Sequence, residues 1–418
     1  MRRMIRRFLI ALALAASLAA PAAAQLSLPP LPVPAPGAVL PETTSRLGET
    51  LDADLLRRAR LDTVTGLLRA NRDVLERGPN GEAIVRSRVI AIAPTEEALQ
   101  QALEASFEIE RRETLEGLDV GIVLLRAPPR MSTRRALRRL RDADPEGVYD
   151  YDHLHVGSGM QSGGAGELAP SNASGSGPRI GLIDGGVGAH PVLAGRVAAQ
   201  RSFVAPTPVA SPHGTAVASL LANNGSAGPG ARLYVADVFG GAPTGGSASA
   251  VARALAWFAD ENIAVINISL VGPRNAVLEV VVTRMIARGH VIVAAVGNDG
   301  PAARPLYPAS YAGVVGVTGV DARDRVLIEA GRGPQVDFAA PGADIEAASD
   351  RAFAAVRGTS YAAPIVAGLI AGELQVPDAS AAQAALTRIQ AGARDLGTRG
   401  RDDVFGAGFI GAHARSIR

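Results

Sequence analysis

The chain has 418 residues, contains no cysteine, and is 47% hydrophobic in composition. A chain of this length is expected to form two or three domains, and without disulfide bonds it must be stabilised by apolar cores. All 42 basic residues are arginine, against 40 acidic residues, so the formal net charge is only +2. This balance argues against a nucleic-acid-binding protein, which would carry a strong excess of positive charge.

The first 24 residues have the features of a secretory signal peptide. Arginines precede an apolar run from Phe8 to Ala20, and three alanines stand just before Gln25. This pattern predicts export, with cleavage after residue 24 and a periplasmic or extracellular location. An uncleaved anchor is the alternative, but the run is short for a membrane span and Pro21 follows it. We therefore expect no stable membrane anchor.

Residues 25–85 are predicted to form a Pro-rich spacer and an amphipathic helical segment. Pro29, Pro30 and Pro32 favour an extended, polyproline-like conformation. Between Leu51 and Leu75, leucine and valine recur at helical spacing, with charged residues between them. One or two helices are expected, and the sequence specifies no partner surface for them.

Residues 86–156 are predicted to form a small α+β domain. The pattern gives strands at 89–93, 108–113, 120–125 and 147–151, with helices at 95–107 and 133–140. Thr95 and Ser132 are placed to cap these helices. The order βαββαβ is the split βαβ, or ferredoxin-like, arrangement, which by itself says little about function. The second helix is rich in arginine, and we interpret this as a solvated face rather than an anion site.

Residues 157–177 are rich in Gly and Ser and are predicted to be a linker. From residue 178 to 418 the pattern changes to near-continuous apolar runs. Strands are predicted at 179–184, 233–238, 264–270, 291–296 and 314–317, and helices at 251–259 and 276–287. Strands that are apolar on both faces and alternate with helices predict an α/β domain, with a parallel sheet covered by helices on both faces.

Four polar side chains in this region lie at the ends of predicted strands or at the starts of predicted helices, where active-site residues are commonly placed. Asp184 ends a predicted strand, His213 and Ser360 begin apolar helices, and Asn298 follows a buried strand. Alone, each residue is explained as a turn former or a helix cap. A serine hydroxyl acts as a nucleophile only with a base and with donors for the developing oxyanion, so the set matters more than its members.

The order Asp, His, Asn, Ser and the surrounding motifs resemble the subtilase family of subtilisin-like serine proteases. The motifs are Ile-Gly-Leu-Ile-Asp-Gly-Gly at 180–186, His-Gly-Thr-Ala-Val-Ala at 213–218, Ala-Ala-Val-Gly-Asn-Asp at 294–299, and Gly-Thr-Ser-Tyr-Ala-Ala-Pro at 358–364. The resemblance covers about residues 179–410. It implies a serine endopeptidase of proteins or peptides, with Asp184, His213 and Ser360 as the triad. Asn298 would share the oxyanion hole with the Ser360 N–H.

The resemblance also implies that residues 86–156 are a propeptide, which acts as a folding chaperone and intramolecular inhibitor. We therefore predict a self-processing precursor that is cut near Gly157, Ser158 and Gly159. Residues 163–176 are the alternative cleavage region. Two departures from the family pattern, Gly185 and Ala216, stand beside the catalytic Asp and His and remove no catalytic group.

The resemblance further implies a substrate-binding edge strand, which pairs with an extended peptide by strand addition. Val271 and Leu306 replace glycines that are common in the family, so we predict a shallow pocket that prefers Ala, Ser or Gly before the cleaved bond. The implied substrate-binding residues are Ser269, Leu270, Val271, Gly272, Ala295, Gly297 and Leu306.

No cofactor is predicted. His153, His155, His190, His290 and His413 lack the spacing of metal ligands and are interpreted as incidental. Structural calcium is common in the family, but no Asp/Asn-rich loop with ligand spacing is present.

Two rival functions are a non-enzymatic binding module and an α/β-hydrolase. A secreted, non-enzymatic binding module would be favoured by loss of a triad residue, and none is lost. An α/β-hydrolase would need Gly-x-Ser-x-Gly and the order Ser, acid, His. Ser360 has neither feature around it.

Overall fold

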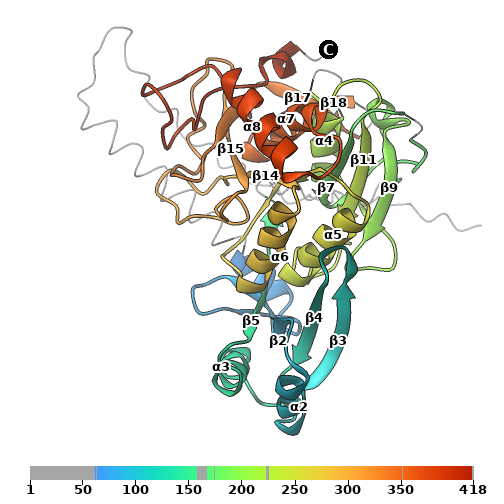
Figure 1. The fold of residues 1–418 in the computed structure, drawn as a ribbon, viewed down its shortest axis with the longest axis vertical. Helices are drawn as coiled ribbons and strands as arrows, with labels where there is room; N and C mark the ends of the chain where they lie inside the picture. Colours follow the sequence, from blue (N-terminus) through green and yellow to red (C-terminus); the bar gives the residue numbers. More distant parts are fainter. Residues whose placement is uncertain are drawn as a thin grey trace, which may run out of the picture. The chain divides into compact units, whose positions relative to one another are not determined.

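A seven-stranded sheet forms the centre of the region from residue 179 to 341 (Figure 1). All its strands are parallel, in the order β16-β15-β14-β12-β7-β11-β9. The strands are β7 (Arg179–Asp184), β9 (Val197–Ser202), β11 (Arg232–Asp237), β12 (Val265–Ile268), β14 (Val291–Ala295), β15 (Val315–Val320) and β16 (Phe338–Pro341). The prediction of a parallel α/β sheet is confirmed. Edge strands β9 and β16 were not predicted, because one is half-exposed and the other is only four residues long.

Helices cover both faces of this sheet, as its apolar strands require. Along β7, Ile180 and Leu182 pack in a core with helices α4 and α7, whereas Ile183 packs in a second core with α5 and α6. This alternation is the two-residue period of a strand whose faces are both buried. The helices are α4 (Pro212–Leu221), α5 (Ala248–Asp260), α6 (Ala276–Ala287), α7 (Thr359–Glu373) and α8 (Ala379–Ala391).

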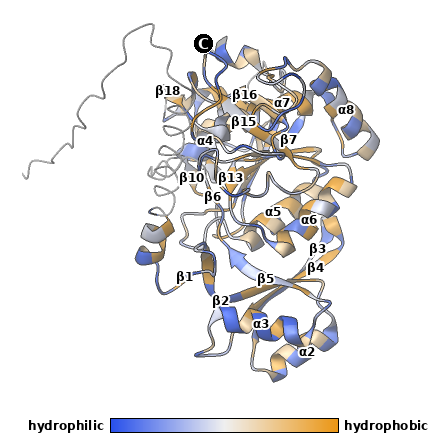
Figure 2. Cartoon of the chain, turned by 90° about the vertical axis from the view of Figure 1, so that its left-hand side faces the viewer, coloured by the Kyte–Doolittle hydropathy of each residue, from blue (hydrophilic) through white to orange (hydrophobic). Residues whose placement is uncertain are grey.

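An antiparallel sheet with two helices precedes this domain. Its strands follow the order β5-β2-β4-β3, and β1 also pairs with β2. Thr95 caps α2 and Ser132 caps α3, as the sequence predicts. The elements are β1 (Leu75–Arg77), β2 (Ala83–Ile92), α2 (Glu96–Glu104), β3 (Glu108–Leu115), β4 (Val120–Arg126), α3 (Thr133–Ala143) and β5 (Val148–His153). The arginines of α3 lie on its exposed face, which is hydrophilic in Figure 2.

Both faces of the N-terminal sheet are buried. Val89 and Ala91 pack under α2 and α3, whereas Ile90 and Ile92 join the core formed by α5 and α6. The apolar run that predicted this strand therefore serves two different cores. Both sheets belong to one compact unit, Arg46–Arg418.

Shorter elements complete the fold. Strand β6 pairs antiparallel with β13, β8 pairs parallel with β10, and β17 pairs antiparallel with β18. Their bounds are β6 (Val156–Gly157), β8 (Gly186–Val187), β10 (Ala210–Ser211), β13 (Leu270–Val271), β17 (Ile345–Ser349) and β18 (Ala352–Val356), with 3-10 helices at Glu116–Leu118, Pro191–Leu193 and Ala412–Ser416.

The computed structural model describes residues 62, 64–157, 167–173, 175–222, 226–350 and 352–416. The predicted signal peptide, the Pro-rich spacer and Ser158–Gly166 lie outside these residues. Within them, no helix combines the length and apolar character needed to cross a membrane. The predicted linker differs from expectation at residues 167–173, because Ala169 is buried and its N–H donates to Val187 O at 2.9 Å.

Candidate active site

Asp184 and His213 meet at the end of the parallel sheet. Asp184 is the last residue of β7, and His213 lies in the first turn of α4, whose N-cap Ser211 accepts from Gly214 N. His213 Nδ1 lies 2.9 Å from Asp184 Oδ2 and 3.1 Å from Oδ1. Both side chains are buried. The carboxylate is therefore placed to hold the imidazole with its proton on Nδ1, which leaves Nε2 as the basic nitrogen.

The pKa of His213 is raised above its ordinary value near 6.5. Burial alone would lower this pKa, but the charge of the Asp184 carboxylate and its hydrogen bond outweigh burial. The protonated imidazole is stabilised by this pairing. A histidine with that property can accept a proton and hold it beside a buried carboxylate.

The absence of a side chain at Gly185 has a steric cause. A Cβ atom at this position would overlap Cβ of Ser211, and the Gly185 N–H donates to Asp184 Oδ1 at 2.8 Å. A backbone N–H therefore supports the Asp184 carboxylate at a position that carries no side chain.

Ser360 lies in the first turn of α7 and is fully buried. Gly358 before it has φ of 137°, a conformation that favours glycine. Ser360 Oγ donates to Ser269 O at 3.3 Å, and Ser269 Oγ donates to Ser360 O at 3.0 Å. The ring of Tyr361 packs against that of His213, with centroids 5.6 Å apart. These contacts bring the start of α7 beside His213 and the start of β13.

The hydrogen bond between Ser360 and His213 is not formed in this structure. His213 Nε2 is buried and has no hydrogen-bond partner within the described part of the chain. Catalytic hydrogen bonds of this kind often tighten only when a substrate is bound. The structure thus joins Asp184 to His213 and places Ser360 on the adjacent helix.

Asn298 follows β14 and is hydrogen-bonded to the segment that carries Ser360. Its Oδ1 accepts from Thr359 N at 3.1 Å, and the neighbouring Gly297 N donates to Thr359 Oγ1 at 3.2 Å. With Oδ1 engaged in this way, the amide is oriented and Nδ2 is its donor end. The Asn298 amide and the Ser360 N–H at the start of α7 are therefore brought close by the same two bonds.

A segment of the chain itself runs through the region beside these residues. In strand β6, Val156 pairs with Val271 and Gly157 pairs with Leu270 of β13 (Figure 2). A Cβ atom on Gly157 would lie 3.8 Å from Cε1 of His213. The preceding His155 donates its N–H to Gly246 O at 2.7 Å. An extended segment thus occupies the position in which a peptide would bind β13 by strand addition.

Leu306 and Val271 narrow the space between β13 and the end of β14. A Cβ atom on Gly297 would lie 2.5 Å from Leu306 Cδ1 and 3.5 Å from Val271 Cγ1. Two bonds between Gly272 and Tyr307 hold the adjoining segments together, at 2.8 and 3.0 Å. Ala295 lies in the core shared with α7. Of the predicted pocket residues, Leu306 and Val271 therefore meet at Gly297, whereas Leu270 and Ala295 pack in the two cores.

Two acidic residues that the sequence analysis missed join the N-terminal sheet to the helices of the second domain. Asp152 accepts from Ser249 N at 2.9 Å and from Ser249 Oγ at 2.8 Å, in the first turn of α5. Asp150 accepts from Ala276 N at 2.7 Å, at the start of α6. The N-caps of these helices are Ser247 and Asn275, and the carboxylates of β5 bind further N–H groups of the first turns, which the helix dipoles favour. The available signal was the alternation of acids with Tyr149 and Tyr151.

His153 and His155, which lack the spacing of metal ligands, both have polar contacts in the structure. His155 lies fully buried in the segment that leads to Gly157, and its Nδ1 is 3.3 Å from Gly246 O. His153 Nδ1 lies 2.9 Å from Asn275 Nδ2, and its Nε2 lies 3.6 Å from Glu82 Oε1. Both histidines contribute to the contact between the end of the N-terminal region and the segments that precede α5 and α6.

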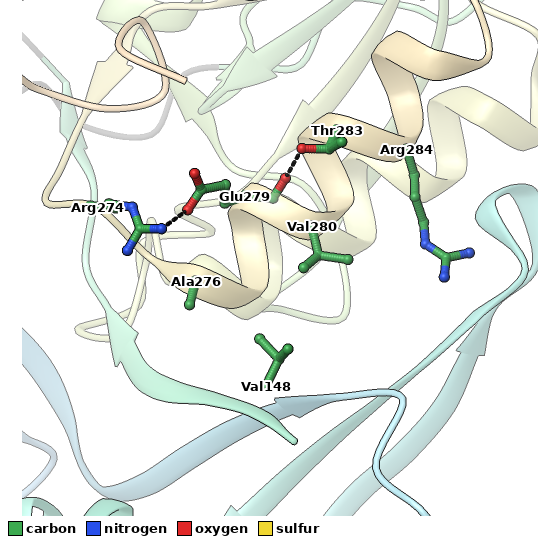
Figure 3. Close-up of a pocket in the computed structure, with 7 residues that line it drawn as sticks. All are labelled: Val148, Arg274, Ala276, Glu279, Val280, Thr283 and Arg284. Atoms are coloured by element: carbon green, nitrogen blue, oxygen red, sulfur yellow. Dashed lines mark hydrogen bonds and ion pairs between the residues drawn. The ribbon is translucent and has the colours of Figure 1, made fainter. Parts of the chain in front are cut away.

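A cavity of about 430 Å³ lies between β5 and α6 (Figure 3). Arg274 forms an ion pair with Glu279, Thr283 Oγ1 donates to Glu279 O at 2.8 Å, and Arg284 donates to Leu118 O at 3.2 Å. The polar groups here are paired with one another or with backbone, so we assign this cavity no chemistry. Its remaining lining residues are Val148, Ala276 and Val280. No group of three or more His, Cys, Asp or Glu residues in the described part of the chain could hold a metal ion.

Comparison with known proteins identifies relatives of the second domain. Residues 175–408 match the sequence profile of the Subtilase family. The chain is 33% identical to Subtilisin Savinase of Lederbergia lenta, over 58% of this chain and 91% of that protein. It is also 33% identical to an alkaline protease of Alkalihalobacillus alcalophilus, over 58% of this chain and 64% of that protein.

A solved structure extends this similarity. The fold resembles that of fervidolysin from Fervidobacterium pennivorans, described as a keratinolytic enzyme related to subtilisin, with a TM-score of 0.64 and 20% identity. The match covers 82% of this chain and 62% of that one. The similarity in fold therefore extends over more of the chain than the sequence matches do.

Proposed function

This chain belongs to the subtilase family, whose members are serine endopeptidases, and we propose that it hydrolyses peptide bonds with Asp184, His213 and Ser360 as its triad. The contact between His213 and Asp184, beside a strand that pairs with β13, is the observation that carries this proposal. A peptide bound in the place of that strand would present its backbone to Ser360.

The residues have distinct roles in the proposed reaction. Ser360 Oγ attacks the peptide carbonyl carbon, and its proton passes to His213 Nε2. The Asn298 amide and the Ser360 N–H stabilise the oxyanion of the tetrahedral intermediate. When the C–N bond breaks, His213 returns the proton to the departing amine, leaving an acyl-enzyme on Ser360. Water repeats the sequence and releases the acid, while Asp184 keeps the imidazole in the required tautomer.

A fluorophosphonate probe tests the nucleophile directly, because it reacts with an activated serine. Wild-type protein should be labelled, and Ser360→Ala should not be. Equal labelling of both would remove Ser360 from its proposed role. Absence of labelling in the wild type, after its mature N-terminus has been verified, would favour a non-enzymatic binding module.

We propose that residues 86–156 are a propeptide and that the chain cuts itself near Gly157, Ser158 and Gly159. The last two of these lie outside the described residues. Support comes from the position of Gly157, which pairs with Leu270 of β13. The residue before Leu270 is Ser269, and its carbonyl oxygen accepts a hydrogen bond from Ser360 Oγ. Bonds just beyond Gly157 are therefore the nearest candidates for attack. Mass-spectrometric determination of the mature N-terminus tests this, and a start before His153 would contradict it.

The same contacts support intramolecular inhibition by the propeptide. Strand β6 occupies the edge of β13 that a substrate would use. The preceding strand, β5, is bound to α5 and α6 through the carboxylates of Asp152 and Asp150. Cleavage alone would leave these contacts in place. We infer that the cut precursor stays inhibited until the N-terminal domain dissociates or is degraded.

For specificity, we propose a preference for Ala, Ser or Gly before the cleaved bond. The approach of Leu306 and Val271 to Gly297 supports it, because these side chains occupy space that a larger residue would need. We further propose that the protein is exported and needs no cofactor. Analysis of the N-terminus of protein recovered from the periplasm or medium tests export, and retention of residues 1–24 would contradict it.

A further inference from the structure

We propose that the ion pair between Arg357 and Glu329 positions the Asn298 amide against the nucleophile, an inference that rests on the proposed function. Arg357 Nε lies 2.8 Å from Glu329 Oε1, and Arg357 Nη2 donates to Glu329 Oε2 at 2.9 Å. The pair is therefore bidentate, a geometry that fixes orientation as well as distance. The Glu329 side chain is only 12% exposed, whereas that of Arg357 is 52% exposed.

Glu329 belongs to a segment that contacts the backbone on both sides of Asn298. Its carbonyl oxygen accepts from Gly300 N at 2.8 Å. Two residues later, Gly331 N donates to Gly297 O at 3.0 Å. The position of the 329–331 segment therefore sets the position of the residues that flank the Asn298 amide.

Arg357 belongs to the segment that carries the nucleophile, three residues before Ser360. Thr359, between them, is bonded to Asn298 Oδ1 and to Gly297 N. Three segments thus form a closed ring of contacts. Residues 357–360 are hydrogen-bonded to residues 297–300, and these are hydrogen-bonded to residues 329–331. The ion pair between Glu329 and Arg357 closes the ring. Side chains supply the closing link.

The backbone of this ring has unusual freedom. Glycines stand at positions 297, 300 and 358 with φ of 99°, 94° and 137°, and another glycine stands at 331. A glycine backbone reaches many conformations at little cost, so contacts must hold these segments in register. A bidentate ion pair with a mostly buried carboxylate restricts them more than an exposed pair would.

Loss of the ion pair should affect the reaction more than substrate binding. The oxyanion exists only after attack on the carbonyl, so a misplaced Asn298 weakens the transition state and leaves the bound peptide unchanged. Removing one oxyanion donor altogether lowers kcat by about 10²–10³-fold. Displacing a donor should do less, and we expect Glu329→Gln and Arg357→Gln each to lower kcat by about tenfold, with KM changed less than about twofold.

The experiment compares these variants on a short peptide ester or amide, with active sites counted by fluorophosphonate titration. A peptide aldehyde inhibitor supplies a second readout, because its tetrahedral adduct carries the oxygen that the donors bind. Its inhibition constant should rise by the same factor as kcat falls. Exchange of the charges, in Glu329→Arg with Arg357→Glu, should recover part of the lost kcat. Arg388→Gln is the matched control, because it breaks an exposed ion pair, 2.8 Å long, between α8 and Glu373 at the end of α7.

The decisive test is the same substitution in the Asn298→Ala background. With the amide already removed, Glu329→Gln should change kcat by less than twofold, because the group that it positions is gone. A tenfold effect of Glu329→Gln in the Asn298→Ala background would overturn the inference. An unchanged kcat in the single variants, or a KM that changes as much as kcat, would also overturn it. If Glu329→Gln fails to fold, Arg357→Gln carries the test, since its side chain is half-exposed. A wild-type protein that the probe does not label contradicts the proposed function itself, whereas a labelled one with insensitive variants contradicts only this inference.

Discussion

Under the proposed preference for small residues, Leu306 limits the size of the side chain that fits before the cleaved bond. Its Cδ1 reaches to 2.5 Å from the place that a Cβ on Gly297 would take, so Leu306→Gly should open the pocket there. Leu306 is half-buried, and its removal should therefore leave the fold intact.

The magnitude follows from the surface that a larger substrate could then bury. Full burial of a phenylalanine side chain is worth about 1.5–3 kcal/mol. Since about 1.4 kcal/mol corresponds to a factor of ten, the ratio of kcat/KM for a Phe substrate over an Ala substrate should rise about 10–150-fold.

The assay uses two fluorogenic peptides that differ only in the residue before the cleaved bond. Leu306→Met, which conserves volume, is the control and should keep the wild-type ratio. An unchanged ratio in Leu306→Gly would show that Leu306 does not line the pocket. A wild-type enzyme that already prefers Phe or Leu would refute the shallow pocket itself.

The other predictions concern the triad and the domain contact. Because the pKa of His213 is raised, kcat/KM should fall on the acid side with a midpoint above about 6.5, and Asp184→Asn should abolish this shift. The charged pair stabilises the fold below about pH 6.5, and this contribution should be lost as pH rises through the raised pKa, which pH-dependent unfolding would reveal. Asn298→Ala should lower kcat about 10²–10³-fold but leave measurable activity. Ser360→Ala should accumulate as uncut precursor on a gel, and normal maturation would contradict self-processing. Asp152→Asn should shorten the delay between self-cleavage and the appearance of activity, because the variant loses a buried carboxylate that accepts two hydrogen bonds from Ser249. An unchanged delay would contradict the proposed role of Asp152.

Local sequence was sufficient to predict most of the main elements, whereas the candidate triad was predicted from the resemblance to the subtilase family. Runs such as 291–296 are apolar throughout, so they predict a strand buried on both faces, and α6 was predicted with its observed bounds. The ends of these elements then carry Asp184, His213 and Ser360. Periodicity placed these residues at the ends of elements, and the resemblance to the subtilase family gave them their predicted roles.

Contacts between distant segments were not predictable in the same way. Pairing of Gly157 with Leu270 depends on register across more than a hundred residues, and no local pattern encodes it. The bonds from Asp150 and Asp152 to α5 and α6 were missed for the same reason, as was the pair formed by Arg357 and Glu329. Each of these joins residues whose neighbours in sequence look like ordinary strand or loop.

The two-faced burial of the N-terminal sheet bears on the direction of maturation. Once separated, this sheet would expose Ile90, Ile92, Ile122 and Leu124 to water, because their present neighbours are α5 and α6. If the N-terminal region is the inhibitory propeptide proposed above, the liberated fragment would lose part of its apolar stabilisation and become a substrate of the enzyme. Activation would then be irreversible, because a degraded fragment could no longer bind the enzyme and inhibit it.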